Sequence, residues 1–120
     1  MTAPFLVLED EPFIALDLKM AFEDAGSNAS VAGSVDEALD ILRDHAVRGA
    51  VLDVNLGRGQ TCWPVAEYLA THGIPFILHT GDLDREGERL RSLNVPIVAK
   101  PALAEDVVER LLGIVAARDA

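Results

Sequence analysis

Acidic, hydroxyl and basic side chains stand directly after short apolar runs at four places in the chain. These four groups are Glu9-Asp10-Glu11, Asp53, Thr80-Gly81 and Lys100-Pro101. Carboxylates brought together from two such places would repel one another strongly without a cation. Mg²⁺ prefers one or two carboxylates together with waters and phosphate oxygens. Lys100, one of only two lysines, would add a fixed positive charge. The pattern therefore indicates a divalent-metal site with an ammonium group beside it.

The elements that would bring these groups together alternate along the chain. Apolar runs without a polar face, at residues 5–8, 51–52, 75–78 and 95–98, are typical of parallel strands covered on both faces. The small, polar segment at residues 28–33 fits a strand nearer an edge. Strand–helix repeats of this kind predict a doubly wound α/β sandwich. Sites in such folds lie at the carboxyl ends of the strands, where all four groups would meet.

Between the strands, apolar residues recur at helical spacing in five segments. Gly26 is placed to end the first helix, and Ser34 with Glu37 forms a capping box before the second. Pro64 suits the first turn of the third. The segments are Ile14–Ala25, the stretch after Ser34 through Leu42, Pro64–Ala70, a short polar helix from about Arg85 to Leu93 capped by Asp82 or Asp84, and a last helix from about Leu103 through Val115.

Length and composition limit the classes of protein to consider. The 120 residues are one domain's worth, so residues 1–120 are expected to form a single domain. Twenty acidic residues against ten basic ones give a net charge of −10, which disfavours nucleic acid as a partner. No apolar run approaches the ~20 residues that a membrane span needs. The single cysteine, Cys62, excludes a disulfide framework. A cytoplasmic protein is expected.

The acidic pair, lone aspartate, hydroxyl and Lys-Pro, in that order, resemble the receiver domain of two-component response regulators. The resemblance covers essentially the whole chain. It implies a flavodoxin-like fold with five helices and a five-stranded parallel sheet in the strand order 2-1-3-4-5. Asp53 would then be the phosphoacceptor that attacks the phosphohistidine of a histidine kinase or a histidine phosphotransfer protein. Such a domain promotes only its own phosphorylation and dephosphorylation, so it is not expected to be an enzyme.

The resemblance also implies a Mg²⁺ site. The side chains of Asp10 and Asp53 would bind the ion, together with the backbone carbonyl of Asn55. Glu9 would act mostly through a metal-bound water. Phosphoryl transfer depends on such positioning and charge neutralisation more than on covalent chemistry.

On the phosphoryl side, Thr80, Gly81 and Lys100 would bind the phosphoryl group and respond to it, and the Lys100-Pro101 peptide bond would be cis. Two positions depart from the commonest receiver pattern. Gly81 stands where alanine is usual, and Ile97 stands where an aromatic residue usually reports the state of the threonine. The usual aromatic response is therefore expected to be missing.

One group of residues resembles the "FAT GUY" receivers in particular. Pro75-Phe76 and Thr80-Gly81 fit that motif, whereas His79 and Asp82 depart from it. His79 lies within an apolar strand segment. It is expected to be a structural histidine with its hydrogen bonds satisfied.

Three functions remain open at this stage. The leading hypothesis is a stand-alone phosphoacceptor that switches the binding of a downstream protein target or drains phosphoryl groups from a kinase. A phosphatase of the haloacid dehalogenase type also uses aspartate, threonine, lysine and Mg²⁺. It needs a second aspartate two residues after the nucleophile, where this chain has Asn55, and a cap domain. The third alternative is an interaction module that is never phosphorylated.

Overall fold

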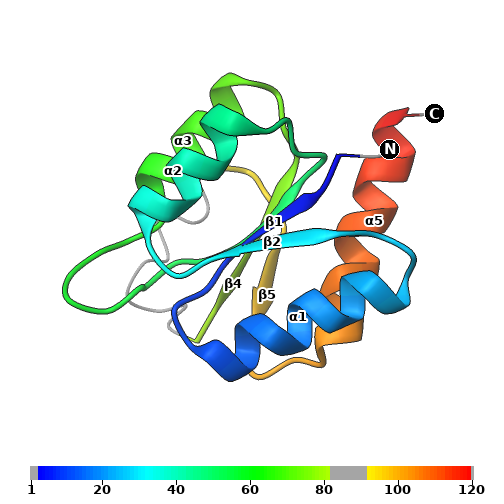
Figure 1. The fold of residues 1–120 in the computed structure, drawn as a ribbon, viewed down its shortest axis with the longest axis horizontal. Helices are drawn as coiled ribbons and strands as arrows, with labels where there is room; N and C mark the ends of the chain where they lie inside the picture. The colour runs from blue at the N-terminus through cyan, green and yellow to red at the C-terminus, as the bar shows by residue number, and fades with distance from the viewer. Residues whose placement is uncertain (1–2, 82–91, 120) are drawn as a thin grey trace.

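The computed structural model describes residues 3–81 and 92–119, in which five parallel strands form one sheet. The strands lie in the order β2-β1-β3-β4-β5, which confirms the expected flavodoxin-like topology (Figure 1). Along the chain the elements are β1 (Phe5–Leu8), α1 (Pro12–Asp24), β2 (Ala29–Ala32), α2 (Val35–Asp44), β3 (Ala50–Asp53), α3 (Trp63–Thr71), β4 (Phe76–Thr80), β5 (Ile97–Ala99) and α5 (Ala104–Asp119).

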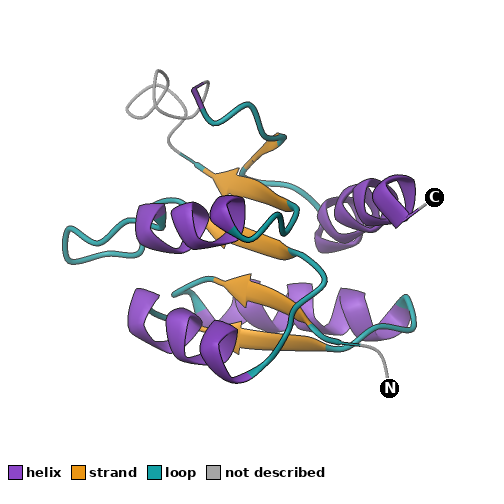
Figure 2. Cartoon of the chain, turned by 90° about the horizontal axis from the view of Figure 1, so that it is seen from above, coloured by secondary structure: helices purple, strands orange, loops and turns teal. Residues whose placement is uncertain are grey.

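Helices cover both faces of this sheet. Helices α1 and α5 lie on one face and α2 and α3 on the other, which makes three layers (Figures 1 and 2). Four helices lie within the described residues, whereas five were expected. The expected helix from Arg85 to Leu93 falls almost entirely in residues 82–91, which are outside the described part. No helix in the described ranges is both long and apolar enough to cross a membrane.

The core is divided in two by the sheet. Successive side chains of a strand point to opposite faces, so each buried strand contributes to both halves. Leu6 and Leu8 of β1 pack in the half under α2 and α3, and Phe5 and Val7 pack in the half under α1 and α5. The ring of Phe5 stacks on Phe22 of α1, with ring centroids 4.8 Å apart. The continuous apolar runs of β1, β3 and β4 are thus explained by burial on both faces.

Local signals set the helix ends as the sequence predicted. Gly26 adopts a φ of +85°, and the N–H of Ser27 turns back to donate to the carbonyl of Phe22 at 2.9 Å. The hydroxyl of Ser34 accepts from the N–H of Glu37 at 3.2 Å at the start of α2. Pro64 lies in the first turn of α3.

The two edge strands give one confirmation and one correction. β2 is an edge strand, as expected for the small, polar segment at residues 28–33. β5 was expected over residues 95–98 and covered on both faces, but it spans Ile97–Ala99 and is partly exposed. Among the described strands, only β4 pairs with it. Pro96 has no N–H to donate, and its carbonyl accepts from the N–H of Leu78 at 3.0 Å just before β5 begins.

Candidate functional site

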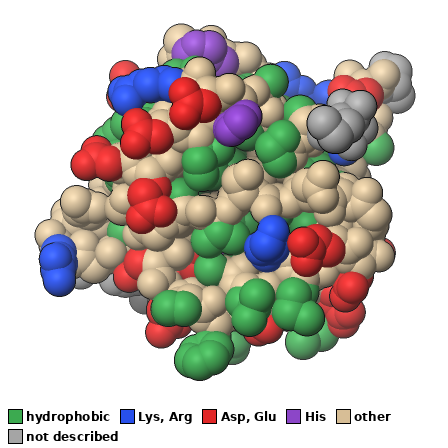
Figure 3. Space-filling model, viewed as in Figure 1, with side chains coloured by type: hydrophobic (Ala, Val, Ile, Leu, Met, Phe, Trp, Pro, Cys, Tyr) green, Lys and Arg blue, Asp and Glu red, His purple; other side chains and the backbone are tan. Residues whose placement is uncertain are grey.

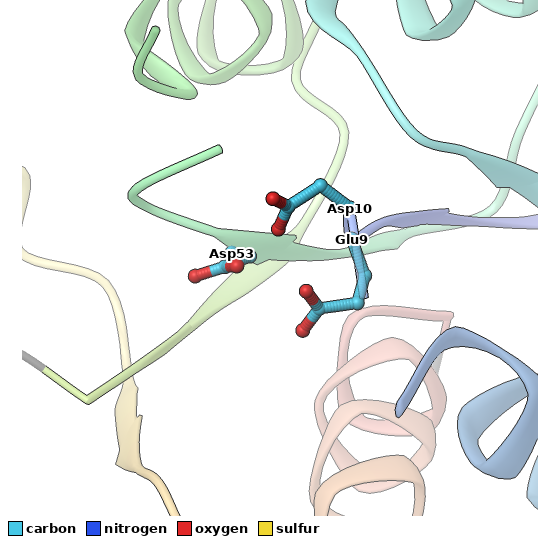
Figure 4. Close-up of side chains that lie close together, drawn as sticks. All are labelled: Glu9, Asp10 and Asp53. Carbon is cyan, nitrogen blue, oxygen red and sulfur yellow. The ribbon is translucent and has the colours of Figure 1, made fainter. Parts of the chain in front are cut away.

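Three carboxylates meet at the carboxyl ends of β1 and β3. Glu9 and Asp10 follow β1 directly, and Asp53 is the last residue of β3. Leu8 and Leu52 are register partners in these neighbouring strands, so Glu9 and Asp53 stand side by side. One carboxylate oxygen from each of the three residues lies within 4.8 Å of the others. Figure 4 shows the three side chains turned toward the same space.

Lys100 supplies the positive charge at this site. Its Nζ lies 2.7 Å from Oε1 of Glu9 and 3.3 Å from Oδ2 of Asp53. The other oxygen of Glu9 accepts from the backbone N–H of Glu11 at 3.1 Å. Glu9 is therefore held at both oxygens. Asp10 is exposed and forms no ion pair with any of the described residues.

The electrostatics of the site differ from one residue to the next. Burial, followed by the neighbouring Glu9 carboxylate, raises the pKa of Asp53 to about 7, although Lys100 opposes the shift. Burial also acts to raise the pKa of Glu9, but the hydrogen bonds from Lys100 and from the N–H of Glu11 outweigh it and hold that pKa below 4.5. Burial acts to lower the pKa of Lys100, yet its two carboxylate partners raise it above 10.5. Lys100 is thus a cation at neutral pH, and Asp53 is the carboxylate that the site tolerates least without further positive charge.

Thr80 and Lys100 lie next to each other because β4 and β5 pair. Thr80 is the buried last residue of β4, and its carbonyl accepts from the N–H of Lys100 at 2.8 Å. Gly81 follows at the exposed end, where an added Cβ would lie 3.8 Å from Cβ of Lys100. The peptide bond between Lys100 and Pro101 is cis. The hydroxyl-bearing residue and the ammonium therefore reach the same edge of the sheet as the carboxylates.

The loop after β3 folds back toward the carboxylates. Asn55 forms an isolated antiparallel bridge with Thr61, and the N–H of Leu56 donates to the carbonyl of Gln60 at 3.0 Å. The turn places Gly57, with a φ of +79°, so that an added Cβ would lie 3.4 Å from Oδ2 of Asp10. The approach of Gly57 to Asp10 was not foreseen, and glycine four residues after Asp53 is the signal that could have revealed it.

Ile97 and His79 complete the account of the expected residues. Ile97 is half-buried in β5 and packs against the core half that lies under α2 and α3. His79 is buried in β4, as expected, but the expectation of satisfied hydrogen bonds is wrong. Neither ring nitrogen has a hydrogen-bond partner in the described part of the chain. Asp82 lies outside the described residues.

The charge balance of the cluster fits a divalent cation. Glu9, Asp10 and Asp53, when ionised, carry three negative charges, and Lys100 offsets one of them. Oxygen ligands are those that hard cations such as Mg²⁺ prefer. Asp10 and Asp53 have the freer oxygens, because Glu9 is already bonded at both. The residues present therefore fit a Mg²⁺ ion bound between the ends of β1 and β3.

Solved structures with a similar fold cover nearly the whole chain. SdrG from Sphingomonas melonis Fr1 is 34% identical over 97% of this chain and 99% of its own, with a TM-score of 0.79. A CheY-like receiver domain from Methanospirillum hungatei JF-1 is 17% identical, covers 99% of this chain and 98% of its own, and has a TM-score of 0.85. The receiver domain of PhyR from Erythrobacter litoralis is 20% identical over 96% of this chain and 90% of its own, with a TM-score of 0.81.

No protein-family model matches the sequence, and a search of curated proteins gives no match. The structural relatives nevertheless cover nearly the whole chain. The chain belongs to the receiver domains of response regulators.

Proposed function

We propose that Asp53 accepts a phosphoryl group, in the presence of Mg²⁺, from the phosphohistidine of a histidine kinase or a histidine phosphotransfer protein. An oxygen of Asp53 attacks the phosphorus atom, the new P–O bond forms as the P–N bond breaks, and the donor imidazole leaves. The phosphorylated protein then changes its binding to a downstream protein, or it serves as a sink for phosphoryl groups. On this proposal the protein acts in the cytoplasm and catalyses only its own modification.

The observation that carries this proposal is the placement of Asp53 against Lys100. Asp53 ends a fully buried strand, and Nζ of Lys100 lies 3.3 Å from its Oδ2. An ammonium fixed at that distance can neutralise charge that develops on the phosphoryl oxygens. It can do so without reorganisation, because Glu9 already holds it at 2.7 Å.

The remaining site residues have distinct roles in this proposal. Asp10, Asp53 and the backbone carbonyl of Asn55 would hold Mg²⁺, and Glu9, fixed by Lys100, would reach the ion only through a water. Bound Mg²⁺ supplies the positive charge that draws phosphoryl oxygens into a site otherwise rich in carboxylates. Thr80 and Gly81, at the end of β4, would bind a phosphoryl oxygen.

An apolar surface on α1 suits the phosphodonor. The surface consists of Phe13, Leu16 and Met20, whose exposed fractions are 83%, 50% and 51%. Figure 3 shows hydrophobic side chains gathered over α1, with acidic side chains beside them. Phe13 follows Asp10 by only three residues, so a protein that brings phosphohistidine to Asp53 must contact the start of α1. We propose that this surface binds the donor protein. The donor's contacting face would then present apolar side chains flanked by basic ones, which complement the apolar and acidic side chains of α1.

Intact mass spectrometry tests the proposal directly. The chain is incubated with Mg²⁺ and a small-molecule phosphodonor, and we expect one added phosphoryl group that requires Mg²⁺. Asp53→Asn should remain unmodified, whereas Asp44→Asn, a change on the exposed end of α2, should be modified like the wild type. Modification of Asp53→Asn to the same extent as the wild type would overturn the assignment.

A further inference from the structure

The connection between β3 and α3, at residues 54–62, forms a short hairpin beside the phosphoacceptor site. Its base is closed by the N–H of Cys62, which donates to the carbonyl of Val54 at 3.0 Å. Nearer the tip, the N–H of Leu56 donates to the carbonyl of Gln60 at 3.0 Å. Figures 1 and 2 show this connection projecting beyond the ends of the strands and of α3. Hydrogen bonds therefore hold the exposed tip of the hairpin in place.

The backbone at the tip of this hairpin is left-handed over three successive residues. Gly57, Arg58 and Gly59 have φ values of +79°, +53° and +76°. Glycine adopts this conformation freely, whereas a residue with a Cβ is strained in it. Strain of this kind at a non-glycine residue is found most often at functional sites. A glycine at position 58 would relieve the strain, so the arginine side chain is present at a cost in stability.

Arg58 also stands out by its charge. Arg58 and Lys100 are the only basic residues in the described connections at the carboxyl edge of the sheet. Lys100 is already bonded to Glu9 and Asp53. Arg58 is exposed and forms no ion pair with any residue that the structure describes. Within the described part of this edge, Arg58 is therefore the one cation that no carboxylate neutralises.

The hairpin brings this cation close to the carboxylates. A Cβ added at Gly57 would lie 3.4 Å from Oδ2 of Asp10, and the Cα atoms of neighbouring residues are about 3.8 Å apart. The Cα of Arg58 therefore lies within about 9 Å of that carboxylate, which is roughly the Debye length at physiological salt. A phosphodonor is an anion, and it must approach a chain with a net charge of −10. A positive charge at this distance attracts the donor before salt screens the interaction fully.

We infer that Arg58 steers anionic phosphodonors to Asp53 by electrostatic attraction at the edge of the site. This role rests on the proposed phosphoryl transfer to Asp53 and adds to it the residue that speeds the approach of the donor. Attraction between opposite charges raises the rate of association, and added salt weakens it. Arg58 needs no contact with Mg²⁺ or with the reacting oxygen, so it is a positioning residue rather than a catalytic one.

The rate of phosphorylation by acetyl phosphate, a dianion at neutral pH, tests this inference on the complete chain with Mg²⁺. At low ionic strength we expect the second-order rate to be about threefold lower in Arg58→Gln, the effect of one charge on a dianion across roughly 10 Å of water. At about 0.5 M salt the two rates should converge, because screening removes the attraction. Phosphoramidate carries a smaller net charge, so its rate should change less.

Matched variants separate the charge of Arg58 from its backbone strain. Arg58→Lys keeps the charge and should keep the wild-type rate. Arg58→Gly relieves the strain, so it should be at least as stable as the wild type in denaturant unfolding and yet react as slowly as Arg58→Gln. Arg110→Gln removes an equal charge from the exposed surface of α5 and should react like the wild type.

The outcomes distinguish this inference from the proposed function. The inference is overturned if Arg58→Gln or Arg58→Gly reacts at the wild-type rate at low ionic strength. A loss of rate that persists at about 0.5 M salt, or that Arg110→Gln shares, would overturn it as well. In each of these cases the proposed function stands as long as Asp53→Asn remains unmodified. Modification of Asp53→Asn to the wild-type extent would overturn the proposed function and the steering role together.

Discussion

The ammonium of Lys100 lies 2.7 Å from Oε1 of Glu9, although 91 positions separate the two residues in the sequence. They follow β5 and β1, which are not neighbours in the sheet, because β3 and β4 lie between them. The lysine side chain therefore extends back across the end of the sheet, and its Nζ also lies 3.3 Å from Oδ2 of Asp53. The ion pair fixes the lysine beside the carboxylate that we propose as the phosphoacceptor.

Removing this charge should impair both folding and switching. Lys100→Met leaves Glu9 and Asp53 without their cation, and we expect the free energy of unfolding at neutral pH to fall by about 1.5–3 kcal/mol, the range for hydrogen bonds to charged groups. Beryllofluoride, an analogue of the phosphoryl group, should no longer change the amide spectrum of the variant in the presence of Mg²⁺. Denaturant unfolding and amide spectra measure the two effects.

The only other lysine provides the matched control. Lys19 pairs with Glu23 at 3.4 Å on the exposed surface of α1, so Lys19→Met should cost about 1 kcal/mol or less and leave the beryllofluoride response intact. Equal responses of the Lys100→Met and wild-type proteins would remove Lys100 from the switch.

Asp10 should be more important for Mg²⁺ than for folding. It belongs to the carboxylate cluster but does not share in the ion pairs of Lys100. Asp10→Asn should therefore weaken Mg²⁺ binding about tenfold or more, a change of ~1.4 kcal/mol, and should leave the metal-free protein at least as stable as the wild type. Thermal melts with and without Mg²⁺ report both quantities. Glu11→Gln, an exposed neighbour outside the cluster, should keep the affinity, and unchanged affinity in Asp10→Asn would contradict its role as a ligand.

The raised pKa of Asp53 predicts how stability without Mg²⁺ depends on pH. Between about pH 4 and pH 7 the folded protein keeps a proton on Asp53 that the unfolded chain, with an ordinary pKa of 3.8, has released. The contribution of Asp53 to the free energy of unfolding therefore falls as pH rises through this window. Glu9 acts in the opposite sense, because its lowered pKa makes it lose stability only as pH falls below 4.5.

Denaturant unfolding at a series of pH values, without Mg²⁺, tests the sign of this effect. The decline from pH 5 to pH 7 should be smaller in Asp53→Asn than in the wild type and unchanged in Asp44→Asn. Mg²⁺ competes with the proton on Asp53, so its apparent affinity should rise toward pH 7. A decline of the same size in Asp53→Asn would assign the proton to another group.

Gly57 and Gly59 form a natural comparison in the loop after β3. Both adopt a left-handed φ, +79° and +76°, so alanine at either position should cost about 1–2 kcal/mol of stability. Only at Gly57 would the new Cβ contact Oδ2 of Asp10, at 3.4 Å, whereas nothing lies within 4 Å at Gly59. Gly57→Ala should therefore weaken Mg²⁺ binding several-fold more than Gly59→Ala, as measured by calorimetric titration. Equal Mg²⁺ affinities would show that the contact with Asp10 has no effect on the metal.

Much of the fold could be predicted because its signals are local. The apolar runs of β1, β3 and β4 predict burial on both faces. Gly26 and Ser34 mark helix ends where hydrogen bonds span only a few residues, and Pro64 lies in the first turn of α3. The strand ends of a parallel α/β sheet share one edge. That rule alone placed the carboxylates, Thr80 and Lys100 together.

The tertiary structure decided the contacts that depend on distances across the sheet. Whether Lys100 reaches Glu9 depends on sheet twist, register and the path of a long side chain over two intervening strands, and local periodicity contains none of these quantities. The same holds for Gly57 against Asp10, which requires the loop to fold back. His79 was correctly placed in a buried strand. Its lack of a partner could not be predicted, because a hydrogen bond depends on which atoms α1 and the β5–α5 connection bring within reach of the ring.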